Sequence, residues 1–316
     1  MYRSLSRRQF TKMTAVTAIF VTFNPAAILK NHRNESNTIR LGGPLFTKYN
    51  NPGEWVNALT VLDYKAAYCP VDITAGEDEI RAYRNAAAKA GILISEVGVW
   101  NNPISPDETE RTSAIDKCIK SLHLADEIGA NCCVNISGSR NRDQWAGPHK
   151  NNLTDETFEM VVEITRNIID AVHPTNTWFT LEAMPWAFPY SPDSYLRLIK
   201  AIDRQRFAVH LDPVNMVVSP EIYFNNGDMI KECFRKLGPH IKSCHAKDIF
   251  LREDIYTPHL DEVRPGLGAL RYDIFLKELS KLKDIPLMME HLNTQEEYDL
   301  AAEYIREVGR KNSITV

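Results

Sequence analysis

Short apolar or β-branched stretches alternate along most of this chain with longer segments in which apolar residues recur every three or four positions. The first pattern is typical of buried β-strands and the second of amphipathic helices. Strands are expected at 39–46, 65–69, 92–100, 132–137, 178–184, 207–212, 241–248 and 286–291. Helices are expected at 54–62, 77–90, 107–128, 154–172, 191–202, 226–237, 272–282 and 295–308.

Eight βα repeats of this kind predict an α/β fold, a closed (β/α)8 TIM barrel rather than an open doubly wound sheet. The glycines Gly91, Gly129 and Gly238 each follow a predicted helix where the chain turns towards the next strand, as a glycine at a helix C-terminus does. With 316 residues and 44% hydrophobic content, the chain can bury one large core. No second domain is required.

The N-terminal segment differs from the rest of the chain. Residues 6–13, SRRQFTKM, carry a pair of arginines, and an apolar run at 15–23 follows that is too short to span a bilayer. The segment resembles a twin-arginine export signal, and the alternative is a basic amphipathic start. We expect residues 1–36 to be signal and linker and 37–316 to be the barrel. The mature protein is then periplasmic, or otherwise extracytoplasmic, without a membrane span.

Composition narrows the classes of partner. The net charge of −4 and the pI near 6.2 create no general field that attracts phosphate backbones, so nucleic acid is not an expected partner. The six cysteines show neither CxxC spacing nor histidine-rich neighbours, which argues against a zinc ribbon. The chain contains no GxGxxG, GxxxxGK[ST] or HExxH motif. Dinucleotide, P-loop and zincin classes therefore have no support.

Charged residues stand at the C-terminal ends of four consecutive predicted strands, where the active site of such a barrel is built. They are Glu182, Asp212, His245 and Glu290. Three carboxylates buried together would repel one another, whereas a divalent metal reverses both the repulsion and the desolvation penalty. One divalent metal is expected, Mn²⁺ first and Co²⁺, Mg²⁺ or Zn²⁺ as alternatives. A turn or helix cap is the structural alternative for Asp212.

These four residues, with the segments EVGVWNN, HLDPVN and SCHAKD, resemble the xylose isomerase-like TIM barrels, also called sugar phosphate isomerases/epimerases. The resemblance covers roughly residues 38–310. It implies that all four bind the metal and that Glu182 and Glu290 are the candidate catalytic bases. One departure concerns Asn215, because the barrels that resemble D-tagatose 3-epimerase have a histidine at this position, three residues after the aspartate.

The resemblance implies removal of a proton next to a carbonyl group. Return of the proton gives an epimer or isomer, and loss of a β-oxygen substituent gives elimination, which some relatives carry out on 3-keto-glycosides. Asn215 and the expected export favour a 3-keto-glycoside or keto-sugar, supplied by an upstream sugar oxidoreductase. The alternatives are an isomerase/epimerase acting on a free ketose or sugar acid, and a non-catalytic exported sugar-binding barrel. An abasic-DNA endonuclease of the same fold would need a basic groove.

Neighbouring residues are candidates for supporting or substrate-binding roles. His210 shares the strand face of Asp212 and lies deeper in the barrel, and Lys247 shares the face of His245, so each can contact substrate or pair with a carboxylate. By the same alternation, Glu96 is expected to point inwards from the third strand.

The loops after the strands add further candidates. His149 is a candidate acid/base, although an exposed loop histidine is often idle. Aromatic and amide side chains at the rim can contact a sugar ring or simply pack there: Trp100, Trp145, Trp186, Phe188 and Asn215. Arg140 and Arg142 follow the fourth strand and can meet an acidic sugar or a phosphate, or remain solvated.

Overall fold

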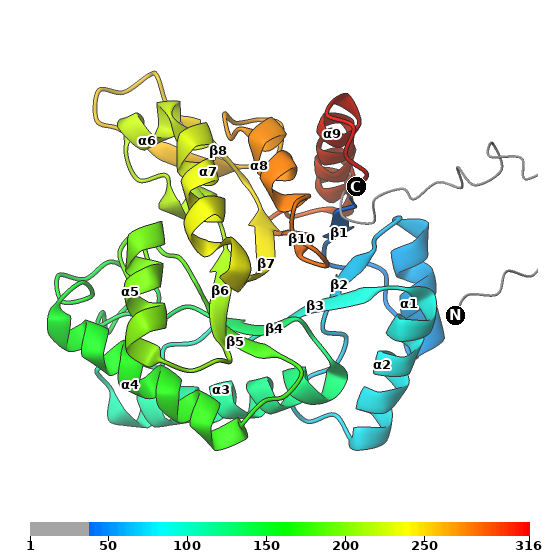
Figure 1. Cartoon of the computed structure of the whole chain (residues 1–316), viewed down its shortest axis with the longest axis horizontal. Coiled ribbons are helices and arrows are strands. Elements are labelled where there is room, and N and C mark those ends of the chain that lie inside the picture. Colours follow the sequence, from blue (N-terminus) through cyan, green and yellow to red (C-terminus); the bar gives the residue numbers. More distant parts are fainter. Residues whose placement is uncertain (1–37) are drawn as a thin grey trace, which may run out of the picture. The chain divides into compact units, whose positions relative to one another are not determined.

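The computed structural model describes residues 38–316, and the segment expected to be an export signal lies outside the described residues. Strands and helices alternate along the chain (Figure 1). The barrel strands are β1 Arg40–Gly42, β2 Ala66–Tyr68, β3 Leu93–Gly98, β4 Cys132–Asn135, β5 Trp178–Glu182, β6 Phe207–Leu211, β7 Ile241–Ala246 and β10 Pro286–Met289. The main helices are α1 Pro52–Val61, α2 Glu77–Ala90, α3 Glu108–Ile128, α4 Asp155–Val172, α5 Pro192–Ile202, α7 Asn226–Leu237, α8 Tyr272–Leu279 and α9 Gln295–Lys311.

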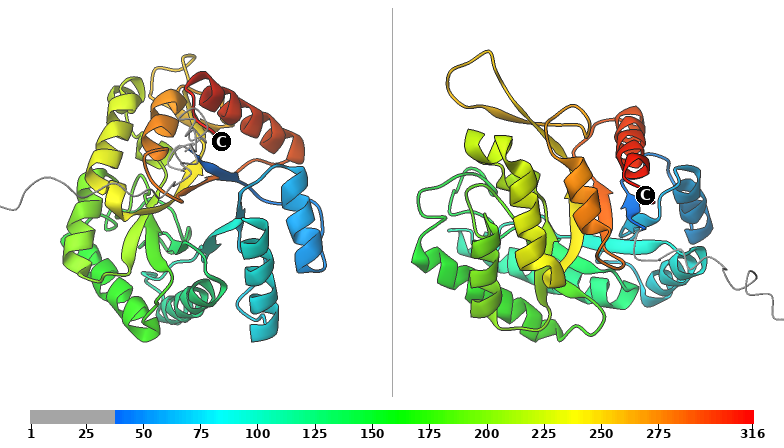
Figure 2. Two further views of the ribbon diagram at one scale, coloured as in Figure 1. Left: turned by 45° about the vertical axis from the view of Figure 1, so that its right-hand side comes forward. Right: turned by 45° about the horizontal axis from the view of Figure 1, so that its top comes forward.

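The eight strands form one parallel sheet in the order β1-β10-β7-β6-β5-β4-β3-β2. Its two ends meet through a hydrogen bond of 2.9 Å that the Lys65 N–H donates to the carbonyl of Leu41, just before β2 and within β1. The sheet is therefore a nearly closed barrel, and the helices lie around it (Figure 2). The predicted TIM barrel is confirmed.

The burial of these segments explains their sequence patterns. Every residue of β4 and β6 is buried, because the barrel interior covers one face of each strand and the helices cover the other. Gly91 and Gly129 end α2 and α3 with left-handed φ values of 69° and 77°, as predicted. Gly238 also follows its helix, but its φ of −42° is right-handed, because the chain continues into a 3₁₀ turn.

The chain after β7 departs from the simple βα repeat. The predicted strand 241–248 ends at Ala246, and an antiparallel hairpin follows, formed by β8 Asp248–Leu251 and β9 Leu260–Val263. The hairpin projects from the barrel at the top of the right-hand view (Figure 2). A short helix, α6 Pro220–Phe224, also precedes α7 and was not predicted. The simple repeat pattern therefore misses the elements that surround one side of the barrel mouth.

The base of this hairpin is held by one buried carboxylate. Asp248 is fully buried and accepts hydrogen bonds from four backbone N–H groups. The donors are Ile249 at 2.9 Å, Gly266 at 2.9 Å, Gly268 at 3.1 Å and Leu270 at 2.8 Å. A side chain at Gly268 would meet Asp248 Oδ1 at 2.3 Å, so the loop approaches the carboxylate too closely for any other residue.

The two ends of the described chain meet beside β1. Thr38 forms a parallel bridge with Thr315, and the Ile39 N–H donates to the carbonyl of Thr315 at 2.8 Å. On its other side β1 pairs with β10. Within residues 38–316, no helix combines the length and apolar character needed to cross a membrane.

Candidate active site

Four adjacent barrel strands bring the predicted ligand residues together. Glu182 ends β5, Asp212 follows β6, His245 lies in β7 and Glu290 follows β10. One ligand atom from each residue lies within 4.8 Å of the others. The register explains the convergence, because neighbouring parallel strands end at the same mouth of the barrel.

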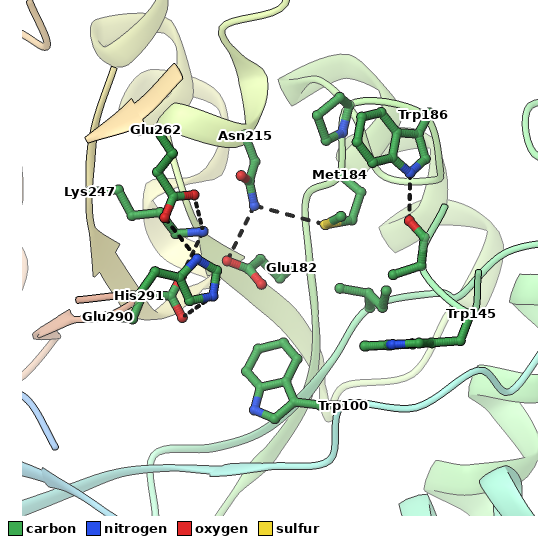
Figure 3. Close-up of a pocket in the computed structure, with 13 residues that line it drawn as sticks. Trp100, Trp145, Glu182, Met184, Trp186, Asn215, Lys247, Glu262, Glu290 and His291 are labelled. Atoms are coloured by element: carbon green, nitrogen blue, oxygen red, sulfur yellow. Dashed lines mark hydrogen bonds and ion pairs between the residues drawn. The ribbon is translucent and has the colours of Figure 1, made fainter. Parts of the chain in front are cut away.

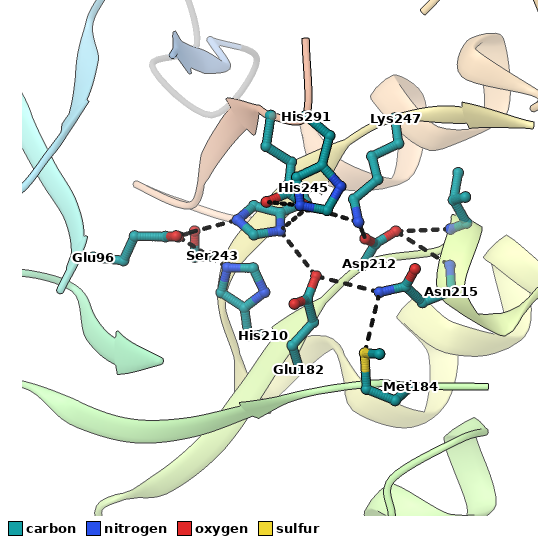
Figure 4. A network of polar contacts seen from close by, with 12 residues as sticks. Glu96, Glu182, Met184, His210, Asp212, Asn215, Ser243, His245, Lys247 and His291 are labelled. Atoms are coloured by element: carbon teal, nitrogen blue, oxygen red, sulfur yellow. Dashed lines mark hydrogen bonds and ion pairs between the residues drawn. The ribbon is translucent and has the colours of Figure 1, made fainter. Parts of the chain in front are cut away.

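Two cationic side chains compensate the carboxylates (Figure 4). His245 Nδ1 lies 2.9 Å from Glu182 Oε1 and 2.7 Å from Glu290 Oε1. Lys247 Nζ lies 2.9 Å from Asp212 Oδ2 and 2.7 Å from Glu290 Oε1. Lys247 is therefore paired with the predicted ligands at the pocket floor.

The four residues fit a divalent metal. Asp212 Oδ2 and Glu290 Oε1 are buried and receive no hydrogen bond of acceptable geometry, although Lys247 lies within ion-pair distance of both. One ligand atom from each residue lies within 4.8 Å of the others, so a single divalent ion with ligands at about 2.0–2.6 Å can contact all four. Three carboxylates and one imidazole are a donor set suited to Mn²⁺, Co²⁺ or Mg²⁺.

The electrostatics of the cluster differ from one carboxylate to the next. Burial, reinforced by the charge of Glu290, raises the pKa of Glu182. Burial acts in the same direction on Glu290, but the neighbouring His245 and Lys247 outweigh it and hold the pKa of Glu290 below its usual range. Burial disfavours the charged form of His245, yet the surrounding carboxylates, with Glu290 and Glu96 foremost, raise its pKa well above the usual value.

A second polar layer lies deeper in the barrel. The Glu96 carboxylate contacts His245 Nε2 at 3.1 Å, His210 Nε2 at 2.9 Å and the Ser243 hydroxyl at 2.8 Å. The two imidazole rings meet edge to face, with centroids 4.1 Å apart. Burial opposes ionisation of Glu96, but the two histidines lower its pKa. The sequence placed Glu96 and His210 on inward faces, and the structure brings both beneath the ligand cluster.

A cavity of about 520 Å³ opens above the cluster (Figure 3). Charged groups and aromatic rings occupy different sides of it. The lining includes Trp100, Trp145, Met184, Trp186, Asn215, Lys247, Glu262 and His291. The Trp186 indole N–H donates to the carbonyl of Ala146 at 2.7 Å and so ties the loop after β5 to the loop after β4. All three tryptophans suggested by the sequence therefore line one cavity.

Trp100 has an unusual backbone conformation at this cavity. Its φ is 49°, in the left-handed region that is strained for a bulky residue. Its ring centroid lies 6.2 Å from that of His245. A side chain at Gly98 would meet the indole nitrogen at 2.3 Å, so glycine is needed for the indole to fold back over β3. The strained backbone thus places an aromatic wall next to the ligand cluster.

Several loop residues do not reach this cavity. His149 lies with Arg142 around a different hollow, and its Nδ1 accepts a hydrogen bond from the Asn151 N–H at 3.3 Å. The Arg140 guanidinium donates to the carbonyl of Ile104 at 2.9 Å and so supports the loop. Phe188 is buried and packs on Phe158, with ring centroids 5.2 Å apart. The structure places His149 and Phe188 outside this cavity, where local contacts hold both side chains.

Two residues that the sequence reasoning missed line the cavity mouth. His291 Nδ1 lies 2.8 Å from Glu262 Oε1, and its Nε2 lies 3.5 Å from Glu290 Oε2. Glu262 also lies 3.4 Å from Lys247 Nζ. His291 directly follows the predicted ligand Glu290, and this position could have indicated that it lies at the cavity. Glu262 belongs to the unpredicted hairpin, so nothing local pointed to it.

The fold and the site define a TIM-barrel protein with a group of acidic and imidazole side chains, able to hold a metal ion, at the C-terminal mouth of its strands. The chain belongs to the xylose isomerase-like TIM barrel family, whose family model matches residues 63–308. Comparison with curated protein sequences gave no match.

Solved structures share the fold at low sequence identity. A xylose isomerase-like TIM barrel protein from Mycobacterium smegmatis in complex with magnesium has a TM-score of 0.61 and 17% identity, covering 88% of this chain and 98% of that one. A probable 3-DHS dehydratase from Bacillus anthracis has a TM-score of 0.63 and 16% identity, covering 86% and 100%. The 3-keto-D-glucoside 4-epimerase from E. coli has a TM-score of 0.62 and 14% identity, covering 85% and 100%.

Proposed function

We propose that this protein is a divalent-metal-dependent sugar enzyme that removes a proton next to a carbonyl group. Its proposed substrate is a 3-keto-glycoside or related keto-sugar, from which a β-oxygen substituent is eliminated. The observation that carries the proposal is the ligand-type cluster of four residues, of which Glu182 and Glu290 line a 520 Å³ cavity with tryptophans on its other side. Cavities of this size hold small-molecule ligands, and aromatic faces stack on sugar rings.

Glu182, Asp212, His245 and Glu290 would hold the metal, whose chemical contribution is to polarise a carbonyl and acidify the neighbouring C–H group. Among the carboxylates, Glu290 is held by Lys247 and His245, both at 2.7 Å. Glu182 contacts His245 and has only a long contact of 3.5 Å with the Asn215 amide. We therefore assign proton removal to Glu182, the less restrained of the two candidate bases.

In the elimination, the C2–H bond breaks and its electron pair forms the C1–C2 double bond. The C1–O bond to the aglycone breaks in turn, and the departing oxygen takes up a proton. His291 lines the cavity and is oriented by Glu262, so we give it the proton-donor role that the sequence suggested for His149. Lys247 can donate a hydrogen bond to negative charge that develops on the sugar oxygen.

The described activities of two proteins of the same fold support this direction. The E. coli protein is described as acting on a 3-keto-D-glucoside, and the B. anthracis protein as a probable dehydratase, a class that eliminates water. At 14% and 16% identity they establish the fold alone, so the site carries the proposal. The second candidate is epimerisation or isomerisation of a free ketose or sugar acid, since the same proton removal begins both reactions.

The cellular setting follows from the N-terminal segment, which the structure does not describe. We propose export by the twin-arginine route, with an upstream sugar oxidoreductase that supplies the 3-keto group. Export argues against a phosphorylated cytoplasmic intermediate as substrate. Asn215 stands where the D-tagatose 3-epimerase-like barrels have histidine, which argues against simple ketose epimerisation.

The deciding experiment incubates the protein and Mn²⁺ in D₂O with a chromogenic 3-keto-glucoside, and separately with free ketoses. Release of the aglycone supports elimination, and His291→Gln should slow it while His149→Ala leaves it unchanged. Deuterium uptake with sugar interconversion and an intact glycoside would replace elimination by the epimerase function. Substrate binding with neither release nor exchange would identify a binding protein.

A further inference from the structure

His245 has carboxylates on both sides of its imidazole ring, two facing Nδ1 and one facing Nε2. Its Nδ1 lies 2.9 Å from Glu182 and 2.7 Å from Glu290. Its Nε2 lies 3.1 Å from Glu96 (Figure 4). A nitrogen that binds a metal must present a lone pair, so the proton of the neutral ring must sit on the other nitrogen. Only the Nδ1 side belongs to the four-residue ligand cluster.

Glu96 is itself held in one position. It is 1% exposed, and its two oxygens are shared among three contacts: His245 on Oε1, and His210 and Ser243 on Oε2. These contacts come from β6 and β7, so the carboxylate of β3 is fixed from across the barrel interior. A buried carboxylate without such partners would be strongly destabilising, which explains why the whole group occurs together.

We propose that Glu96 is a positioning residue that keeps the proton of His245 on Nε2 and leaves Nδ1 free to bind the metal. The inference rests on the metal site of the proposed function. Carboxylate partners of metal-binding histidines fix the tautomer and ring orientation and make the imidazole a stronger ligand. Glu96 does this from the layer beneath the four-residue ligand cluster, and it does not line the 520 Å³ cavity.

The first test measures Co²⁺ binding to the folded, chelator-stripped protein by competition titration and by the visible absorption spectrum of the bound ion. Glu96→Gln keeps the size of the side chain but offers one acceptor oxygen where the histidines need two. We expect its Co²⁺ affinity to fall about 10–100-fold, with an altered spectrum. Ser243→Ala is the matched control, because it removes a contact of Glu96 and leaves the contact with His245 in place.

If Glu96 only satisfies buried histidines, Glu96→Gln will lower the melting temperature of the metal-free protein but leave Co²⁺ affinity and spectrum unchanged, which overturns the inference alone. If the wild-type protein binds no divalent ion, both the inference and the proposed function are wrong. A second measurement needs no change at Glu96: ¹H–¹⁵N spectra of the Zn²⁺-loaded wild type, with the His245 signal identified by its loss in His245→Gln. A proton on Nε2 is expected, and a proton on Nδ1 would overturn the inference.

Discussion

Replacement of Asp248 by alanine should destabilise the protein more than almost any other single change outside the apolar core. The carboxylate is fully buried and receives four backbone hydrogen bonds, from Ile249, Gly266, Gly268 and Leu270. Alanine leaves all four N–H groups without a partner. At about 1 kcal/mol for each unsatisfied donor, with some relief as the loop opens to water, the expected loss is roughly 4 kcal/mol. Whole proteins of this kind are stable by only about 5–15 kcal/mol.

Urea unfolding followed by circular dichroism measures this loss. The unfolding midpoint of Asp248→Asn should lie between those of the wild type and the alanine variant. Its side-chain oxygen can still accept from Ile249 and Leu270, while its NH₂ group faces the other two N–H donors. Asp254→Ala is the control on the same hairpin, where an exposed ion pair with Arg252 adds little, and its midpoint should match the wild type. An unchanged midpoint for Asp248→Ala would refute the assignment of this carboxylate as the anchor of the hairpin.

Three further outcomes are expected. Asp212→Ala removes one oxygen of the ligand cluster and should abolish Mn²⁺ binding, so a manganese content equal to that of the wild type after dialysis would exclude this site. Burial raises the pKa of the Cys69 thiol to about 11. Its reaction with a disulfide reagent at pH 8 should therefore run roughly 200-fold slower than that of a free thiol. In urea-unfolded protein the two rates should be equal. Lysines in place of Arg7 and Arg8 should leave the protein inside the cell, and unchanged export on fractionation would contradict the twin-arginine route.

The barrel and the convergence of the four ligand-type residues were predictable because both follow from local patterns. Most strands are short apolar or β-branched stretches, and a parallel barrel brings the ends of all its strands to one mouth. Residues such as Glu182 and Asp212 therefore meet without any knowledge of distant contacts. Glu96 and His210 followed from alternation along a strand. The prediction therefore succeeded where the position of a residue follows from the βα repeat or from alternation along a strand.

The cavity rim was harder to predict, because distant contacts decide it. The predicted strand 241–248 runs across the break between β7 and β8, so the hairpin that carries Glu262 went unrecognised. His149 has a suitable side chain in a suitable loop, but its hydrogen bond from Asn151 fixes it in another hollow. A loop residue's type says nothing of the direction in which its side chain points.

The pairing of β1 has a consequence for the order in which the molecule can be made. The first strand takes its neighbours from the last part of the chain, β10 on one side and Thr315 at its beginning, while its link to β2 is the hydrogen bond between Lys65 and Leu41. Because a ribosome delivers β1 well before β10 and Thr315, the first strand must wait for both before it has these partners. The barrel therefore cannot close before β10 has been synthesised, and a chain stalled before β10 presents an open sheet with two unpaired edges.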